Sequence, residues 1–286
     1  MKEYFHGGHF LCPGCLGGTL WRAVLQVLGK NCIVASGATC ANLPLSLYPT
    51  NVQVPGITVS MASSAALLSG MSAAIEVLQE KGRMRLKEKI HLVSLVGDGC
   101  SADIGFSCLS GAAERNVDAI YICFDNEAYM NTGIQRSSQT PAMAWTTTSL
   151  GGKKQPKKDL PTIMVGHGIP YVATATLGFY DDLKEKLTRA RDMGPGFKYI
   201  HVLSPCPPGW RFPENKAIEV SRLAVETGLW ILYEVEEGRM KITYRPKARK
   251  PVAAYLSSQG RFSSLTPKQV AGIQMEIDQK WKQMKD

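Results

Sequence analysis

The sequence has 286 residues, of which 44% are hydrophobic and 20% are charged. This length and composition can bury a sizeable core, so they exclude a disordered chain and predict one large domain or one and a half. The 33 basic and 24 acidic residues give a net charge of +9, but the basic residues are scattered, which favours solvated surface or an acidic protein partner over nucleic acid. The sequence lacks an apolar run long enough to span a membrane and an apolar secretory segment after Met1, so we expect a soluble cytoplasmic protein.

The first part of the chain alternates helical and strand-like segments. Residues 18–28 carry apolar side chains at helical spacing, and residues 31–35 form a short apolar run typical of a strand. Residues 37–56 are rich in Pro, Asn and Thr and predict a loop. Residues 63–81 are rich in small side chains and predict a helix that can approach another backbone closely.

The strongest α/β pattern comes next in the chain. Residues 91–96 and 118–124 are continuous apolar runs, which are typical of parallel strands covered on both faces. Between them, residues 103–114 predict a helix with Asp103 as its cap.

Residues 125–158 show little apolar periodicity, and an irregular stretch of this length in a compact domain is usually functional. We expect an α/β fold in which a mostly parallel sheet carries helices on both faces, followed by a C-terminal hairpin and helix extension. The expected domains are residues 1–228 and residues 229–286. The remaining predicted elements are strands at 171–174 and 198–203, helices at 181–193 and 217–227, a hairpin at 229–244, and an amphipathic helix at 267–284.

The cysteines fall into two groups. Cys32, Cys108 and Cys123 lie in apolar stretches and are typical of small core residues, while Cys100 follows a glycine-rich turn and is ambiguous. A cytosolic chain of this size does not use its cysteines as a disulfide framework. A different explanation is therefore needed for the four that lie in Gly- and Pro-rich surroundings, namely Cys12, Cys15, Cys40 and Cys206.

The spacing of these four thiols predicts a metal centre. Cys12 and Cys15 form a CxxC turn, and Cys40 and Cys206 each follow a predicted strand. If both strands belong to one parallel sheet, the thiols open toward the same edge, where they fit a [4Fe-4S] cluster or an all-cysteine zinc site. Zinc ribbons normally contain two CxxC pairs, so the spacing favours iron–sulfur, with zinc and inert cysteines as open alternatives.

A second constellation lies at two strand ends. Gly97-Asp98-Gly99 ends one buried strand and precedes a helix, so the backbone can approach a phosphate there. Asn126 follows the end of the next strand, and its side chain, with Asp98 and the carbonyl of Ala128, offers the oxygen ligands that Mg²⁺ prefers. Gly-Asp-Gly alone is more often an ordinary turn. Its pairing with Asn126 resembles the thiamine-diphosphate motif.

The stretch from Gly97 to Pro141 closely resembles the cofactor-binding segment of 2-oxoacid:ferredoxin oxidoreductases. The segments CPGC, SGATC and LSPCPPGW resemble the same family, and the similarity runs in the same order from about Gly8 to the C-terminus. The chain is thereby identified as similar to the β subunits of this family, of the pyruvate:ferredoxin oxidoreductase (pyruvate synthase) type.

The resemblance implies a role for each matching residue. Asn131 would lie near the thiazolium and the substrate as the catalytic residue, and Thr132 would support the diphosphate. Leu16 stands where family members commonly have glycine, which puts the packing beside the thiamine pocket and the substrate preference in doubt. The other implied ligands are the magnesium oxygens of Asp98, Asn126 and Ala128, the glycines Gly97 and Gly99 beside the diphosphate, and the cluster thiolates of Cys12, Cys15, Cys40 and Cys206.

The resemblance also implies the reaction and the partners. Such an enzyme decarboxylates a 2-oxoacid with thiamine diphosphate and passes single electrons to a proximal [4Fe-4S] cluster and then to ferredoxin. An α subunit would supply the activating glutamate and much of the substrate pocket, beside a ferredoxin-like subunit and coenzyme A, with no nucleic acid or membrane involved. We expect activity only in the presence of these subunits. Pyruvate is the expected substrate, with oxalate, branched-chain and aryl 2-oxoacids as alternatives.

Two hypotheses from other classes remain at this stage. A non-redox thiamine enzyme would use Asp98 and Asn126 but would leave the four loop cysteines unexplained. A non-catalytic metal-binding scaffold subunit would explain the cysteines but would make the pairing of Asp98 with Asn126 a coincidence.

Overall fold

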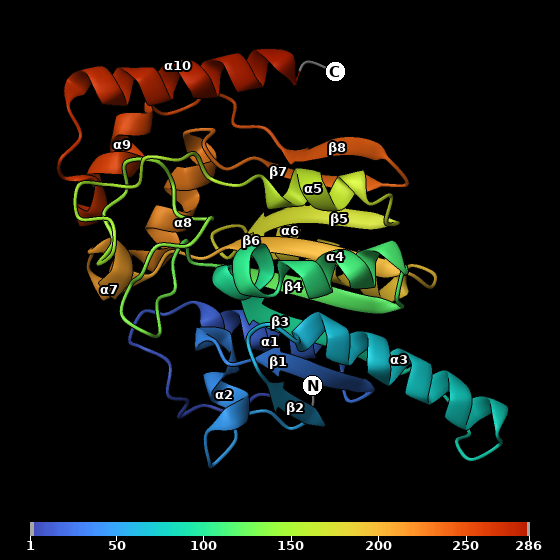
Figure 1. Ribbon diagram of the computed structural model, residues 1–286. Coiled ribbons are helices and arrows are strands. Elements are labelled where there is room, and N and C mark those ends of the chain that lie inside the picture. Colours follow the sequence, from blue (N-terminus) through green and yellow to red (C-terminus); the bar gives the residue numbers. More distant parts are fainter. Residues whose placement is uncertain (1–2, 285–286) are drawn as a thin grey trace.

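Buried apolar strands form the centre of the molecule. In this computed structural model, which describes residues 3–284, eight strands form one sheet in the order β2-β1-β3-β4-β6-β5-β7-β8 (Figure 1). All neighbouring strands from β2 to β5 are parallel, and β7 and β8 are antiparallel additions. The strands are β1 (Cys32–Gly37), β2 (Gly56–Val59), β3 (His91–Gly97), β4 (Ala119–Asp125), β5 (Tyr171–Thr176), β6 (Phe197–Leu203), β7 (Leu232–Glu236) and β8 (Arg239–Tyr244).

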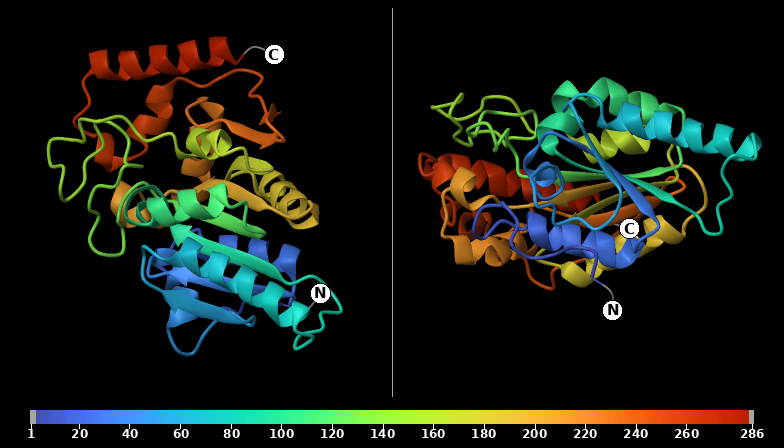
Figure 2. Two further views of the ribbon diagram at one scale, coloured as in Figure 1. Left: turned by 45° about the vertical axis from the view of Figure 1, so that its right-hand side comes forward. Right: turned by 90° about the horizontal axis from the view of Figure 1, so that it is seen from below.

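Helices cover both faces of the sheet (Figure 2). One face carries α1 (Gly17–Leu28) and α6 (Tyr180–Asp192), and the other carries α3 (Ser64–Glu80), α4 (Phe106–Glu114) and α5 (Leu160–Gly166). Within residues 3–284, none of the helices combines the length and apolarity needed to cross a membrane. The other helices are α2 (Leu43–Ser46), α7 (Pro207–Trp210), α8 (Ala217–Glu226), α9 (Val252–Ser257) and α10 (Pro267–Gln283).

The parallel strands place their carboxyl ends at one edge of the sheet. Every residue of β4 and β6 is buried, because helices cover both sides of these continuous apolar runs. The register pairs Gly97 at the end of β3 with Phe124, and Asp125 at the end of β4 with Leu203. The segments that follow β1, β3, β4 and β6 therefore emerge side by side. With Gly97 at the end of β3, they contain all the predicted site residues except the CPGC turn.

The predicted fold class is confirmed, including the C-terminal hairpin and helix. The hairpin β7–β8 continues the main sheet through antiparallel pairing of β7 with β5, and Thr266 caps α10 with a capping box. The division at residue 228 stays a prediction, and its outer limits at residues 1 and 286 lie outside the described part of the chain.

Some local predictions were wrong. Residues 37–56 are not only a loop, since they contain α2 and lead into β2, and α5 was not predicted. Asp103 does not cap a helix, because Cys100–Ile104 forms a π-helical turn and α4 begins only at Phe106. The Asp103 carboxylate instead accepts a hydrogen bond from the backbone N–H of Ser138 at 3.0 Å. A side chain expected to act locally thus anchors the long segment after β4.

The burial of β4 predicts a specific sensitivity. Ile122 is fully buried in β4, so Ile122→Val removes a packed methylene and should lower the free energy of unfolding by about 1 kcal/mol. Ile57 on the edge strand β2 is 44% exposed, and Ile57→Val should cost less than about 0.5 kcal/mol. Denaturant unfolding of the two purified variants measures both values, and equal losses would contradict the difference in burial.

Candidate active site

The irregular segment of residues 126–158 lies at the carboxyl ends of the strands (green in Figure 1). Lys153 fixes this segment from inside, since it is 3% exposed and its ammonium donates to the carbonyls of Ser138, Thr140 and Pro156 at 2.6–3.2 Å. Lys153 is therefore a buried support of the segment and not a surface side chain. The segment is therefore a built structure, and it can hold neighbouring side chains in fixed positions.

Three oxygen-bearing groups converge at the ends of β3 and β4. One terminal amide atom of Asn126 lies 2.8 Å from the carbonyl oxygen of Ala128 and 3.0 Å from Asp98 Oδ1. With nitrogen at this position the amide donates to both oxygens, and with oxygen three acceptors face one another. Neighbouring ligands in an octahedral Mg²⁺ shell with bonds of 2.0–2.1 Å lie about 3.0 Å apart. Both distances from Asn126 are therefore compatible with neighbouring ligands of one magnesium ion.

The electrostatics of Asp98 also call for a cation. Its carboxylate is 1% exposed, and Ser137 Oγ donates to Oδ2 at 2.6 Å. Burial raises the pKa of Asp98 well above its usual range, and the negative charge of Asp125 adds to the shift. Lys157 binds the carboxylates of Asp125 and Glu127, and within residues 3–284 no basic side chain forms an ion pair with Asp98. A metal cation would compensate this buried charge.

A small cavity of about 30 Å³ opens beside these ligands. Thr39 Oγ1 lines it and is buried, with no hydrogen-bond partner in the part of the chain that the structure describes. The predicted glycines border the same cavity, but a Cβ atom at Gly99 would lie 2.4 Å from the ring of Tyr129, so this glycine makes room for Tyr129. Asn131 and Thr132 are exposed at its rim.

A second cavity, of about 260 Å³, is lined by four cysteines. Cys40 and Cys206 follow β1 and β6, which belong to the parallel part of one sheet, as the sequence argument required. Burial raises the pKa of the Cys40 thiol to about 12 and that of the Cys206 thiol to about 12, and the neighbouring thiols add to both shifts. The thiols that share this cavity are those of Cys12, Cys15, Cys40 and Cys206.

The thiols surround the cavity and do not meet at one point. Within residues 3–284, no group of three or more His, Cys, Asp or Glu side chains is placed to hold a single metal ion. The cysteine cavity adjoins the smaller one, because four residues line both: Cys40, Asn126, Met130 and Asn131. A group held by the thiols would therefore lie next to a group held at Asp98.

Charged side chains pack beneath the turn that carries Asn126. Lys157 Nζ lies 2.6 Å from both Asp125 Oδ2 and Glu127 Oε1, and Arg261 lies 2.6 Å from Glu127 Oε2. His201 Nε2 lies 2.7 Å from Asp125 Oδ2. Burial acts to raise the pKa of Asp125, but Lys157 and the hydrogen bond from His201 outweigh it and lower this pKa to about 2. Asp125 is thus a structural anion paired by the protein, unlike Asp98.

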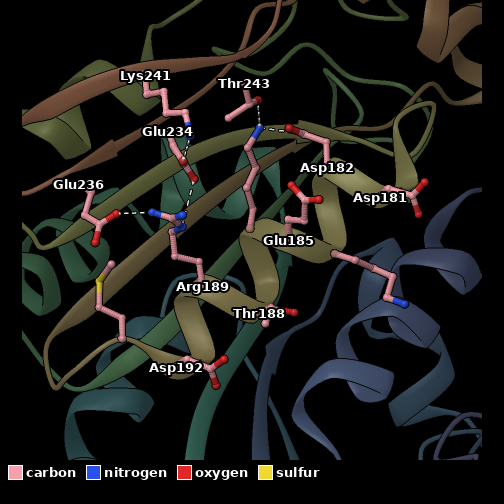
Figure 3. A pocket seen from close by; sticks show the side chains of 13 residues that line it. Asp181, Asp182, Glu185, Thr188, Arg189, Asp192, Glu234, Glu236, Lys241 and Thr243 are labelled. Carbon is pink, nitrogen blue, oxygen red and sulfur yellow. Dashed lines mark hydrogen bonds and ion pairs between the residues drawn. The ribbon is translucent and has the colours of Figure 1, made fainter.

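A larger cavity, of about 900 Å³, lies elsewhere, between α6 and the β7–β8 hairpin (Figure 3). Two of its basic side chains are paired with acidic ones: Arg189 with Glu236 at 2.6 Å, and Lys186 with Asp182 at 2.7 Å. None of the predicted site residues lines it. We therefore assign the active site to the two adjoining cavities at the strand ends.

The structure thus brings the predicted residues into two neighbouring groups, while their roles as ligands stay predictions. Sequence reasoning missed the residues that support them: Thr39, Ser137, Lys157, Trp210 and Arg261. Thr39 and Trp210 lie inside segments already singled out, SGATC and LSPCPPGW. Lys157 and Arg261 carry no local motif, since their partners lie far away in the sequence.

Comparison with known proteins first gives the class. Residues 35–202, more than half of the chain, match the family described as "Thiamine pyrophosphate enzyme, C-terminal TPP binding domain". The structure also aligns with the 2-oxoglutarate:ferredoxin oxidoreductase of Magnetococcus marinus at a TM-score of 0.61 and 21% identity, over 77% of this chain and 79% of that chain, which shows a shared fold.

Sequence relatives then give the family. Pyruvate synthase subunit PorB of Methanocaldococcus jannaschii is 47% identical over 98% of this chain and 96% of its own length. Ketoisovalerate oxidoreductase subunit VorB of Pyrococcus horikoshii is 40% identical over 100% of this chain and 93% of its own length. The chain therefore belongs to the β-subunit family of the 2-oxoacid:ferredoxin oxidoreductases, which confirms the family that the motifs indicated.

The buried charges predict a large effect of removing Lys157. Lys157→Met leaves Asp125 and Glu127 short of a cation and should lower the free energy of unfolding at neutral pH by about 3 kcal/mol. Asp125 stabilises the fold fully above its unfolded pKa of about 3.9 and loses this contribution as the pH falls through about 2, so the deficit should narrow in acid. Thermal denaturation against pH measures this, with the exposed Lys154→Met as the control. Equal behaviour of the two variants would show that Lys157 carries no buried pairing.

Proposed function

We propose that this chain is the cofactor-binding β subunit of an enzyme that oxidatively decarboxylates a 2-oxoacid, pyruvate first, and delivers single electrons to ferredoxin. The observation that carries the proposal is the contact between two cavities, one lined by oxygen ligands at Asp98 and the other by four thiols. Thiamine carbanion chemistry beside a one-electron carrier requires this adjacency. Neither the non-redox thiamine enzyme nor the non-catalytic scaffold gives a reason for it.

The first cavity has room for a magnesium ion, and thiamine diphosphate would extend from that ion across the rim of the cavity. Asp98 Oδ1, the amide oxygen of Asn126 and the carbonyl of Ala128 would hold Mg²⁺, and Ser137 would keep the Asp98 carboxylate turned toward it. Gly97, Gly99 and Thr132 border the space for the diphosphate. The orphaned hydroxyl of Thr39 is a further donor toward that group.

The second cavity suits a [4Fe-4S] cluster. Four thiolates are the ligand set of such a cluster, and a cluster fills a volume between its ligands. A zinc ion would draw four sulfurs to about 2.3 Å from one centre. The cysteines line a cavity of about 260 Å³ and do not form a single-ion group within the described residues, so this arrangement supports the cluster over zinc.

The residues of this chain would position the cofactors, shield them from water and orient the substrate. Thiamine diphosphate, when bound, supplies the electron sink for decarboxylation. Asn131 lines both cavities, so it is placed to donate a hydrogen bond to the substrate at their junction. Met130 and Phe124 give the cysteine cavity apolar walls that exclude water between the two sites.

Other chains would complete the enzyme. The activating glutamate for thiamine, much of the substrate pocket and the outward electron path would come from an α subunit and a ferredoxin-like subunit, with coenzyme A as acyl acceptor. The exposed position of Asn131 and Thr132 at the rim supports this, because a partner can cover the site there. Pyruvate is proposed as the substrate because PorB, at 47% identity, is named for pyruvate, and the name of VorB makes a branched-chain 2-oxoacid the alternative.

The cluster assignment predicts the effect of a single thiol. The anaerobically purified complex should contain about four irons and four sulfides for this chain, beyond those of other subunits. Cys206→Ser should remove most of them, because one of four ligands is lost, whereas Cys108→Ser in α4 should leave them unchanged. Iron and sulfide analysis measures both variants. Zinc in place of iron in the wild-type protein would refute the assignment.

The partner assignment predicts that this chain alone is inactive. With pyruvate, thiamine diphosphate, Mg²⁺, coenzyme A and ferredoxin, the separated chain should reduce ferredoxin at less than about 1% of the rate of the whole complex, since activation of the thiamine requires the missing glutamate. The whole complex should show a higher kcat/KM for pyruvate than for 2-oxoisovalerate. Full activity of the separated chain would refute the partner assignment, and the reverse preference would replace pyruvate as the substrate.

A further inference from the structure

One buried residue contacts both the turn that carries Asn126, a proposed Mg²⁺ ligand, and the loop that carries Cys206, a proposed cluster ligand. The indole N–H of Trp210 donates to the carbonyl oxygen of Asn126 at 2.8 Å. The backbone N–H of the same residue donates to the carbonyl oxygen of Cys206 at 2.8 Å. Trp210 is fully buried, so neither bond competes with solvent. A single residue thus links the backbone of an implied Mg²⁺ ligand to that of an implied cluster ligand.

The ring of Trp210 is fixed in place by a buried ion pair. The guanidinium carbon of Arg261 lies 3.6 Å from the centre of the ring, and the Arg261 side chain is 2% exposed. Arg261 also lies 2.6 Å from Glu127 Oε2 and donates to Gln259 Oε1 at 2.9 Å. Since cation–π contacts strengthen when they are desolvated, this stack restricts the rotation of the indole. The hydrogen bond to Asn126 therefore has a fixed direction.

A second contact joins the same two loops. A Cβ atom built on Gly209 would lie 2.2 Å from Met130 Sδ and 3.3 Å from Cys206 Sγ. The glycine leaves room for Met130, which lies between the two cavities, to pack in its present position against the cysteine loop. Gly209 and Trp210 thus bring the loops together through packing and through a hydrogen bond.

We propose that Trp210 is a positioning residue that sets the separation between the Mg²⁺–thiamine diphosphate group and the [4Fe-4S] cluster. The inference rests on the proposed function and deepens it, because it names the element that couples the two cofactors. A mobile turn at Asn126 would broaden the range of distances between the two groups. Because the rate of electron transfer depends steeply on distance, such a range would make that rate vary. Trp210 restricts this freedom, although it lines neither cavity.

The experiment uses the whole complex, purified anaerobically and loaded with thiamine diphosphate. Mn²⁺ is supplied in place of Mg²⁺. Pulsed EPR of the reduced protein measures the distribution of distances between Mn²⁺ and the nearest cluster, and titration measures the Kd of thiamine diphosphate. Trp210→Phe removes the indole N–H but keeps an aromatic ring under Arg261. Trp281→Phe in α10 is the matched control. It also removes an indole N–H, which donates a hydrogen bond of 2.8 Å to the carbonyl oxygen of Gly228.

In Trp210→Phe we expect a broader distance distribution and a Kd that rises about fivefold, the typical value of one hydrogen bond, with iron content unchanged. Trp281→Phe should match the wild-type protein in all three. If Trp210→Phe fails to fold, Gly209→Ala tests the same coupling, because it displaces Met130 and should also broaden the distribution. A narrow distribution in a folded variant at either position overturns the inference. Absence of iron or of thiamine binding in the wild-type complex overturns the proposed function instead.

Discussion

The site depends on one carboxylate that the protein buries without giving it a cation. Asp98 directly follows the buried end of β3, and no basic side chain in the described chain forms an ion pair with it. In the turn after β4, Glu127 adopts the left-handed conformation at φ +66°, and the terminal amide of Asn126 lies 2.8 Å from the carbonyl oxygen of Ala128. A non-glycine residue in that conformation is strained. Lys157 and Arg261 hold its carboxylate and Thr140 donates to its carbonyl at 2.6 Å, which keeps the strained turn in place.

The thiols reach the same edge through the topology of the sheet and through one close contact. Cys40 and Cys206 follow two parallel strands, so their place is a consequence of strand direction. The CPGC turn precedes α1 and needs a separate anchor. Gly14, at φ +71°, supplies it, because a Cβ atom there would lie 2.4 Å from the carbonyl oxygen of Glu214. The turn therefore docks on the segment that follows Cys206, and this contact closes the ring of thiols around the cavity.

The sequence was sufficient for features that depend on local pattern and strand direction. Continuous apolar runs predicted β3 and β4, and residues at their ends were expected to meet, as Asp98 and Asn126 do. Features that depend on partners far away in the chain were not predictable. Lys153 follows two glycines in an irregular segment, as surface lysines often do, yet its ammonium is buried and donates to three backbone carbonyls. Asp103 has the position of a helix cap, but the π-helical turn moves it away from the start of α4. In each case, a tertiary hydrogen bond replaced the local role that the residue type suggests.

The C-terminal part of the chain also supports the site through contacts between residues far apart in the sequence. Arg261 follows α9, far from the strand ends in sequence, but its side chain lies between Trp210 and Glu127. Its backbone carbonyl accepts the N–H of Trp145, which ties it to the long segment after β4 as well. Removing one partner from the buried pair of Arg261 and Glu127 would leave an uncompensated charge. The pair therefore also holds Arg261 against the ring of Trp210. The proposed magnesium ligands lie at the ends of two strands, and their relative positions are held by residues that are not proposed as ligands themselves.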